Sequence, residues 1–140
     1  MIDVRYKKAK EDAIPFKYSR EYDACLDMYS NEDTVLYPGD IRIVKTGIIV
    51  QIPAGFEGIV RGRSGMASRG ILTHVGTIDE NYRGEVGVIL YNLSQDYYNI
   101  HKGDRIAQFT VKPAYRVAMT ESEELSKTDR GDKGYGSSGI

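Results

Sequence analysis

Residues 41–61 of this chain, IRIVKTGIIVQIPAGFEGIVR, carry the clearest signal for its fold class. Residues 41–46 partly alternate between apolar and polar side chains, and residues 47–52 and 56–61 continue as short apolar-rich segments around the turn Pro-Ala-Gly. Short segments of this kind, interrupted by glycine and proline, are typical of strands joined by tight turns. The stretch therefore predicts an all-β protein.

The rest of the chain continues this pattern. Residues 85–93 form another long, mostly apolar segment, and the turns YPGD at residues 37–40 and KGD at residues 102–104 each precede a further β-rich segment. Proline and then glycine in YPGD are the residues that a type II turn favours. Only residues 120–127, rich in glutamate, are weakly helical or simply solvated. Regular strand spacing fits sandwiches, jelly rolls and small barrels alike.

The composition fits one hydrophobic core of ordinary size. The chain has 140 residues, of which 41% are hydrophobic, so we expect a single domain over residues 1–140. Residues 1–22 are expected to supply an N-terminal strand and a connection. The 19 basic and 20 acidic residues nearly balance, which predicts no nucleic-acid partner and no membrane partner.

Cysteine and histidine are too sparse for a disulfide or a structural zinc site. Cys25 is the single cysteine, and the two histidines are well separated in the sequence. No apolar run reaches the length of a membrane span, and the N-terminal stretch MIDVRYKKAK lacks the apolar segment of a signal peptide. We therefore expect a cytoplasmic protein.

Several common catalytic motifs are absent from the sequence. It contains no P-loop, no HExxH and no GxSxG motif. The stretch GRSGMA, residues 62–67, follows a predicted strand and is expected to open a short helix with Ser64 as its N-cap. The same backbone N–H groups suit phosphate oxygens, although capping is the more common role.

Residues 76–84, GTIDENYRG, place two carboxylates, an arginine and a tyrosine in one turn region. Taken alone, the segment is either a polar β-turn in which Asp79 bonds its own backbone, or a functional loop. In residues 102–108, KGDRIAQ, Asp104 and Arg105 are interpreted as ordinary structural partners. Asp27 lies in an otherwise apolar stretch, where a buried carboxylate needs a cation such as arginine.

In order and spacing, these segments resemble the five motifs of the trimeric dUTPase family. The match extends from about residue 23 to residue 139, and the third and fifth motifs together are highly specific. The first twenty or so residues carry no distinctive motif. The five matching segments are residues 24–27 (ACLD), 63–67 (RSGMA), 76–84 (GTIDENYRG), 103–108 (GDRIAQ) and 130–139 (RGDKGYGSSG).

The resemblance implies a distorted jelly-roll, or dUTPase-like β-barrel, that assembles as a homotrimer with active sites at subunit junctions. It implies hydrolysis of dUTP to dUMP and pyrophosphate, which limits uracil incorporation into DNA and supplies dUMP for dTMP synthesis. Residues 119–140 would be the C-terminal arm, ending in a flexible glycine-rich lid.

The resemblance also implies a role for each matching residue. Asp79 would be the catalytic residue that orients and deprotonates the water attacking the α-phosphorus. Tyr82 would lie flat against the deoxyribose and exclude a 2′-hydroxyl, while a hairpin around residues 72–77 would offer its backbone to uracil. The substrate-binding residues would be Arg63, Ser64, Gly65, Thr73, Gly76, Thr77, Ile78, Tyr82, Gln108, Arg130, Tyr135, Gly136, Ser137 and Ser138.

For the triphosphate, the resemblance implies both protein groups and a metal ion. Ser64, the Gly65 amide and Gln108 would hold the phosphates, and Asp27 would support the site by anchoring Arg63. Mg²⁺ would bridge phosphate oxygens and travel mainly with the nucleotide, so no residue is expected to be a metal ligand.

The glycine-rich tail would close over the bound nucleotide. Tyr135 would stack on uracil, and Arg130, Ser137 and Ser138 would reach the γ-phosphate. Four positions depart from the common family pattern without removing a reacting group, namely Cys25, Gly62, Lys133 and Tyr135.

Three alternatives to this interpretation remain. One is a dCTP deaminase-type enzyme of the same superfamily, which needs a second catalytic carboxylate. Another is a non-catalytic, nucleotide-binding regulatory relative, against which the presence of Asp79 together with the whole lid argues. The third is a structural β-sandwich with an unstructured tail, which would make the order of the five motifs a coincidence.

Overall fold

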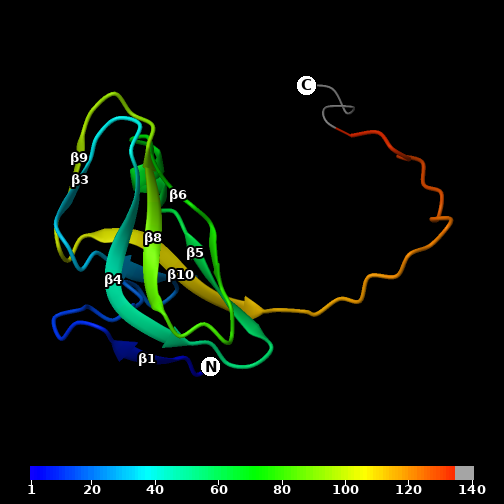
Figure 1. The fold of residues 1–140 in the computed structure, drawn as a ribbon, viewed down its shortest axis with the longest axis horizontal. Coiled ribbons are helices and arrows are strands. Elements are labelled where there is room, and N and C mark those ends of the chain that lie inside the picture. Colours follow the sequence, from blue (N-terminus) through cyan, green and yellow to red (C-terminus); the bar gives the residue numbers. More distant parts are fainter. Residues whose placement is uncertain (135–140) are drawn as a thin grey trace.

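The computed structural model describes residues 1–134, and its regular secondary structure is almost entirely β-strand (Figure 1). The predicted all-β class is therefore confirmed. In chain order the elements are β1 (Arg5–Lys8), β2 (Leu26–Tyr29), β3 (Thr34–Leu36), β4 (Ile41–Gln51), β5 (Phe56–Arg61), α1 (Ser64–Ala67), β6 (Ile71–Thr73), β7 (Gly76–Ile78), β8 (Glu85–Asn92), β9 (Tyr98–Ile100) and β10 (Arg105–Pro113).

Within the described residues, the strands form two four-stranded sheets and a small two-stranded one. The first sheet has the order β1-β4-β8-β6, the second has the order β2-β10-β5-β7, and β3 pairs with β9. All pairs are antiparallel, and neighbours in a sheet are often distant in the sequence, which is the jelly-roll arrangement.

The core lies between the sheets because their strands alternate buried and exposed positions. In β8 every second residue is buried, beginning with Val86 and ending with Asn92. In the second sheet Phe109 is 1% exposed, and a Cβ at Gly58 on the neighbouring strand would lie 2.8 Å from its ring. The glycine therefore makes room for the largest buried side chain of the core, whose removal costs about 3–5 kcal/mol at such sites.

Both predicted Gly-Asp turns are present. The Asp40 amide donates a hydrogen bond to the Tyr37 carbonyl oxygen at 3.0 Å, and Gly39 has a φ of 84°, as a type II turn requires. The second turn closes through the Asp104 amide, which donates to the His101 carbonyl oxygen at 2.9 Å around Gly103. Each turn directs the chain into a new strand, β4 and β10 respectively.

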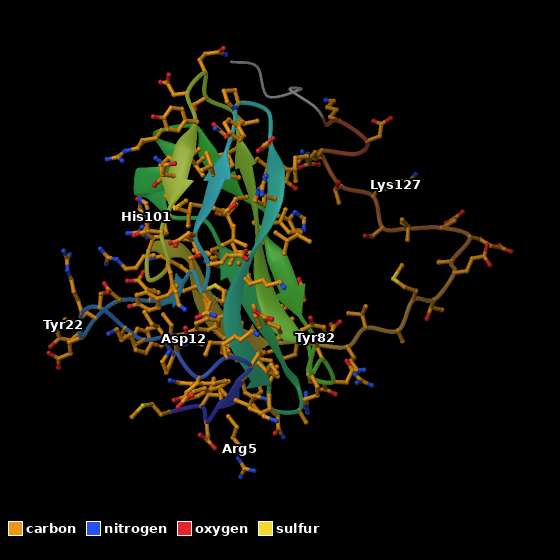
Figure 2. All side chains as sticks on the ribbon, turned by 60° about the vertical axis from the view of Figure 1, so that its left-hand side comes forward. Arg5, Asp12, Tyr22, Tyr82, His101 and Lys127 are labelled. Atoms are coloured by element: carbon orange, nitrogen blue, oxygen red, sulfur yellow. The ribbon has the colours of Figure 1, made fainter. Side chains whose placement is uncertain are left out.

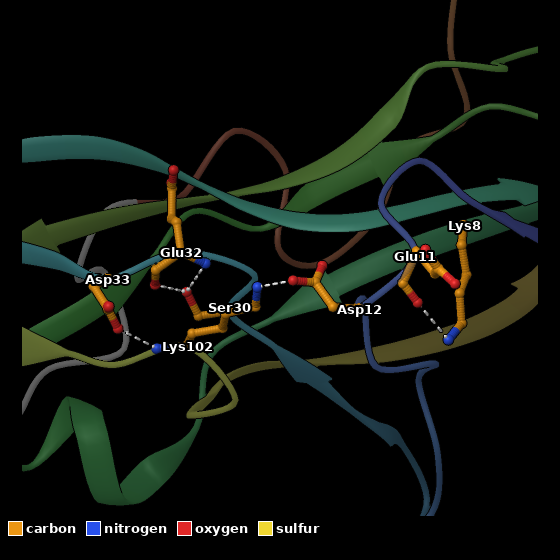
Figure 3. Close-up of polar contacts among 7 residues, drawn as sticks. All are labelled: Lys8, Glu11, Asp12, Ser30, Glu32, Asp33 and Lys102. Atoms are coloured by element: carbon orange, nitrogen blue, oxygen red, sulfur yellow. Dashed lines mark hydrogen bonds and ion pairs between the residues drawn. The ribbon is translucent and has the colours of Figure 1, made fainter.

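The N-terminal segment is attached to the body by strand pairing and by polar contacts. Figure 3 shows Lys102 between two carboxylates: its backbone N–H donates to Asp33 Oδ1 at 2.8 Å, and its Nζ bonds Asp12. The hydrogen bond from Lys102 lowers the pKa of the Asp12 carboxyl below its ordinary value. Ala13, beside Asp12 in the chain, is buried in the core. These contacts give the segment without a recognised motif a structural role.

After β10 the chain leaves the body as an arm, defined here as residues 114–134, which runs out into solvent (Figure 1). Residues 120–127 are exposed and contain neither helix nor strand, in agreement with the solvated alternative. No helix in the described part of the chain has both the length and the apolar character needed to cross a membrane.

Candidate active site

The first group of predicted site residues lies across three neighbouring strands of the second sheet. Gln108 on β10 pairs on one side with Asp27 on β2 and on the other with Arg61 on β5. Because β5 ends at Arg61, residues 63–65 follow at the same end of that strand. We call Asp27, Gln108 and residues 63–65 the Asp27 cluster.

The Asp27 carboxylate is buried, and its Oδ2 atom has two hydrogen-bond donors. It accepts a hydrogen bond from the Ser19 hydroxyl at 2.5 Å and an ion-paired hydrogen bond from Arg105 Nη1 at 3.2 Å. Burial raises the pKa of this carboxyl, but the Ser19 hydrogen bond and the hydrogen bond and charge of Arg105 together lower the pKa below its ordinary value. Asp27 is therefore held as a carboxylate.

The prediction that Asp27 anchors Arg63 is wrong. The direct partner of Asp27 is Arg105, and Arg63 Nη1 instead donates to the Arg105 carbonyl oxygen at 2.7 Å. An irregularity in the pairing of β10 with β2, just after Arg105, accompanies this arrangement. The predicted Asp104–Arg105 partnership is also wrong, because the Asp104 carboxylate accepts the His101 amide.

Ser64 is not the N-cap that the sequence predicted. The chain leaves β5 with Arg63 still extended, at φ −100° and ψ 131°, so Arg63 is the cap and Ser64 is the first helical residue. No side-chain hydrogen bond caps α1, and its Met66 is buried. The Ser64 side chain, part of the Asp27 cluster, is exposed and makes no capping hydrogen bond.

The second group of predicted site residues follows the opposite edge of the same sheet. β7 pairs only with β5, so its outer backbone groups are available to a ligand. The predicted hairpin around residues 72–77 is wrong, because β6 pairs with β8 in the first sheet. Thr73 belongs to that sheet, and its Oγ1 is buried without a hydrogen-bond partner among the described residues.

Residues 79–85, here called the Asp79 loop, are braced by their own backbone. The Tyr82 amide donates to the Asp79 carbonyl oxygen at 3.1 Å, and Arg83 Nη1 donates to the carbonyl oxygens of Glu80 and Tyr82. The Tyr82 hydroxyl donates to the Glu85 carbonyl oxygen at 3.0 Å. The loop is thus a polar turn closed by Tyr82 and Arg83, and not the predicted one in which the Asp79 side chain bonds its own backbone.

The Asp79 carboxylate takes no part in this bracing. It is exposed, makes none of the hydrogen bonds found within residues 1–134, and lines a hollow of about 350 Å³ together with Glu80, Asn81 and Arg116. A rigid loop with an unengaged carboxylate at a hollow is the geometry that a general base needs.

The two groups lie far apart within one chain. Ile78, which precedes Asp79, pairs with Gly58, whereas Gln108 pairs with Arg61. This offset is about 10 Å along β5 at roughly 3.3 Å per residue, and β7 and β10 are two strand spacings, about 10 Å, apart. Figure 2 shows Tyr82 on the opposite side of the body from Tyr22, which lies in the connection before β2.

The arm holds the last group of predicted residues. Arg130 is exposed, and its Nε donates to the Lys133 carbonyl oxygen at 3.0 Å, so this bond is local to the arm. The arm contacts the body at its root, where the Ala114 amide donates to the Gly55 carbonyl oxygen and Arg116 pairs with Glu80. Outside the described residues lie the predicted lid residues Tyr135, Gly136, Ser137 and Ser138.

The described residues do not form a cage for Mg²⁺. Across residues 1–134, no group of three histidine, cysteine or acidic side chains is close enough to hold a metal ion. Oδ2 of Asp27, the buried carboxylate of the site, already accepts hydrogen bonds from Ser19 and Arg105. A magnesium ion here would need most of its oxygen ligands from phosphate and water.

The sequence analysis did not identify Ser19 and Arg105, the two residues that donate hydrogen bonds to Asp27. Arg105 lies inside the segment GDRIAQ, so its motif was seen but its partner was not. Ser19 lies in a connection without a distinctive pattern, and no signal in the sequence points to its contact with Asp27. Both contacts arise because β10 and the chain preceding β2 converge on one carboxylate.

Taken together, the fold and these groups define a jelly-roll protein whose polar site groups lie at opposite ends of one sheet. The dUTPase family model matches residues 11–139. The chain belongs to the dUTPase family, a family of hydrolases, so the resemblance seen in the sequence is confirmed.

Individual relatives agree with this assignment. The deoxyuridine 5′-triphosphate nucleotidohydrolase of Clostridioides difficile is 42% identical over 143 residues, covering 100% of both chains. A Staphylococcus bacteriophage 80alpha dUTPase variant, solved with dUpNHpp, superposes with a TM-score of 0.92 at 28% identity and 99% coverage of each chain. A dUTPase variant from phage phi11 of S. aureus, whose structure describes a structural Mg(II) ion, has a TM-score of 0.82 at 25% identity, covering 88% of this chain and 98% of that one.

Proposed function

We propose that the protein hydrolyses dUTP to dUMP and pyrophosphate in the cytoplasm, at active sites shared between the subunits of a homotrimer. The reaction limits uracil incorporation into DNA and supplies dUMP for dTMP synthesis. The observation that supports shared sites is the separation of Asp79 from the Asp27 cluster within one chain. A base works within about 3 Å of its water, so a second copy of the chain must bring its Asp79 loop to the cluster.

In this proposal Asp79 is the general base. Its carboxylate orients a water in line with the α-phosphorus and takes its proton as the water attacks. The bond from the α-phosphorus to the bridging oxygen breaks, and pyrophosphate leaves. Tyr82 and Arg83 hold the backbone of the loop in place. This reduces the entropic cost of positioning the Asp79 carboxylate for the reaction.

The Asp27 cluster is proposed to bind the triphosphate. The exposed Ser64 hydroxyl, the Gly65 amide and the Gln108 side chain offer hydrogen bonds to phosphate oxygens. The guanidinium groups of Arg63 and Arg105 add positive charge, while Asp27 fixes Arg105. Mg²⁺ bound to the triphosphate supplies charge neutralisation when it is present, and it arrives with the nucleotide.

The edge strand β7 and Tyr82 are proposed to recognise the nucleoside. Outer backbone groups of residues 76–78 pair with the uracil edge, and a mismatched base leaves buried polar groups unpaired. Thr73, on the preceding strand β6, is proposed as a further substrate-binding residue. The Tyr82 ring lies against the deoxyribose. Residues 130–138 are proposed to close the site, with Tyr135 and Gly136 over uracil and Arg130, Ser137 and Ser138 at the γ-phosphate.

Product analysis tests the reaction. The purified protein is incubated with Mg²⁺ and either dUTP or dCTP, and the products are separated and identified. We expect dUMP and pyrophosphate in equal amounts from dUTP, with little product from dCTP. Ammonia released from dCTP would assign the protein to the deaminase branch, and binding of dUTP without turnover would assign it to the regulatory relatives.

Subunit mixing tests the shared site. Asp79→Asn chains and Arg63→Ala chains are unfolded together in equal amounts and refolded, so that subunits combine at random. A shared site works only when its Asp79 comes from an Arg63→Ala chain and its Arg63 from an Asp79→Asn chain. About one half times one half, or roughly a quarter, of the sites are then intact.

The matched control replaces the Arg63→Ala chain by a chain that carries both substitutions. That mixture contains no intact Asp79 and is expected to stay inactive. Recovery of dUTP hydrolysis near a quarter of the wild-type rate in the first mixture alone supports the shared site. No recovery, with subunit exchange verified by mass spectrometry of the native assembly, would refute it.

A further inference from the structure

Gly84 is a glycine for a reason that its own backbone does not provide. Its φ lies outside the left-handed region, so any residue is compatible with the conformation of its main chain. A Cβ built at this position would nevertheless overlap Oη of Tyr82 and lie 2.5 Å from its Cζ and 2.9 Å from its Cε2. These three nearest atoms all belong to one side chain, which therefore lies directly over Gly84.

Tyr82 is held in this position from both ends. Its backbone N–H closes the turn with the Asp79 carbonyl oxygen, and its hydroxyl bonds the Glu85 carbonyl oxygen at 3.0 Å. The residue is still 42% exposed, so one side of the ring rests on the loop and the rest is open. The hydroxyl group is already used by Glu85, which leaves the open face of the ring as the part that meets a ligand.

We propose that Gly84 is a positioning residue for sugar selection, because only a residue without a side chain lets the Tyr82 ring lie down on the loop. This inference rests on the proposed function, in which the ring faces the deoxyribose. Steric exclusion of a 2′-hydroxyl depends on the position of the Tyr82 ring. A Cβ at residue 84 needs about 3.4 Å or more from the ring, so the ring must move by roughly 1 Å.

When the ring is displaced, the Tyr82 hydroxyl loses its hydrogen bond to the Glu85 carbonyl oxygen. Tyr82 is partly exposed, so its ring can move toward solvent at little cost to the fold. The space beside the sugar then opens, and a ribose 2′-hydroxyl is no longer excluded. Gly84→Ala is therefore expected to act as a partial removal of Tyr82, without touching any substrate atom itself.

The test is Gly84→Ala in the full-length protein, with kcat/KM measured for dUTP and for UTP by pyrophosphate release. We expect the ratio of the two values to fall by about tenfold or more, since excluding one small group by shape is worth up to roughly a hundredfold. The midpoint of thermal unfolding should change by only a few degrees, because the residue that must move is a partly exposed side chain.

A second background separates positioning from any other effect of the substitution. In Tyr82→Ala the atoms that meet the new Cβ are gone, so adding Gly84→Ala is expected to leave the dUTP to UTP ratio within about twofold. A tenfold loss in the wild-type background together with no further loss in Tyr82→Ala supports the inference. An unchanged ratio in Gly84→Ala, or an equal loss in both backgrounds, would overturn it.

These outcomes are distinguishable from a failure of the proposed function. If the wild-type protein does not hydrolyse dUTP, the proposed reaction is wrong and so is the inference. If the wild-type protein hydrolyses dUTP and UTP equally well, the reaction stands but the sugar role of Tyr82 is wrong. Only a selective wild-type enzyme whose selectivity ignores Gly84→Ala contradicts the role of Gly84 alone.

Discussion

Asp27 and Asp79 are carboxylates of the same sheet, and their surroundings differ in almost every respect. Asp27 is 5% exposed, lies inside a strand and is bonded by both Ser19 and Arg105. Asp79 is exposed and lies in the loop after an edge strand, and its carboxylate accepts no hydrogen bond within the described residues. The backbone is braced around Asp79, whereas the side chain is braced at Asp27.

This difference assigns a structural role to Asp27 and a chemical role to Asp79. A buried carboxylate with two donors holds neighbouring elements together, and the donors that lower its pKa keep it ionised at neutral pH. An exposed carboxylate on a rigid backbone contributes little to stability, yet it can accept a proton from water. Substitution at each position should therefore change a different measured quantity.

The largest expected effect is the loss of turnover in Asp79→Asn. The amide can hold a water molecule but cannot take its proton, so kcat for dUTP should fall by about 10²–10⁴-fold. Binding of dUTP, measured by calorimetry in the presence of Mg²⁺, and the melting temperature should stay close to those of the wild-type protein. Near-normal turnover of Asp79→Asn would show that Asp79 is not the general base, and the contrast between the two carboxylates would then fail.

Deleting residues 129–140 should lower turnover by about ten- to a hundredfold while the body stays folded. The described part of this segment is exposed and is bonded locally, so it adds little to the core. The estimate corresponds to the roughly 1–3 kcal/mol that stacking of one aromatic on a base contributes. Sedimentation and circular dichroism report assembly and fold, and full activity of the truncated protein would show that no lid is needed.

Asp27→Asn should instead lower stability. An amide keeps the shape of the side chain but loses the charge that Arg105 faces, and charged hydrogen bonds of this kind contribute about 1.5–3 kcal/mol. Denaturant unfolding measures the difference, with Asp79→Asn as the matched control. If both substitutions cost the same free energy of unfolding, the contrast between the two carboxylates is wrong.

The pH dependence of stability should reveal Asp27 as well. Because its pKa is lowered in the folded protein, its stabilisation is fully present above the ordinary pKa of 3.8 and is lost as the pH falls through the folded-state pKa. The melting temperature of the wild-type protein should therefore fall more steeply below pH 3.8 than that of Asp27→Asn. Parallel curves for the two proteins would mean that Asp27 is not a stabilised carboxylate.

The smallest expected effect concerns Glu80, the neighbour of Asp79. Its carboxylate accepts the Gly55 amide at 2.6 Å and pairs with Arg116 at 3.3 Å, where the Arg116 side chain is 92% exposed. Arg116→Gln should cost less than about 1 kcal/mol, because exposed ion pairs are weak. Glu80→Gln keeps an acceptor for the Gly55 amide, so its loss of stability should equal that of Arg116→Gln. A tenfold loss of kcat in either variant would contradict the ranking of this effect as the smallest.

Much of the fold could be predicted because it depends on local patterns. The long, mostly apolar segment of residues 85–93 appears as β8, and the glycines of both Gly-Asp turns have positive φ angles. These signals involve residues close in the chain, where side-chain period and backbone sterics act directly. The order of the motifs likewise needed no structure, and it led to the family.

Other predictions failed because strand partners are chosen by the whole sheet. The family resemblance implied a hairpin around residues 72–77, yet Thr73 pairs with Leu90 in one sheet and Gly76 pairs with Val60 in the other. Ser64 looked like a cap, but the extended end of β5 moved that position to Arg63. A short segment cannot indicate which distant strand will satisfy its backbone.

The amino-acid sequence alone determined the all-β class, the dUTPase motifs and the identity of Asp79 as the candidate base, since these depend on residue type and order. The tertiary structure alone decided that Arg105 and not Arg63 pairs with Asp27, and that the Tyr82 ring rests on Gly84. It also placed the two site groups at opposite ends of one sheet. These facts depend on strand register and side-chain packing between distant residues, which become defined only when the chain has folded.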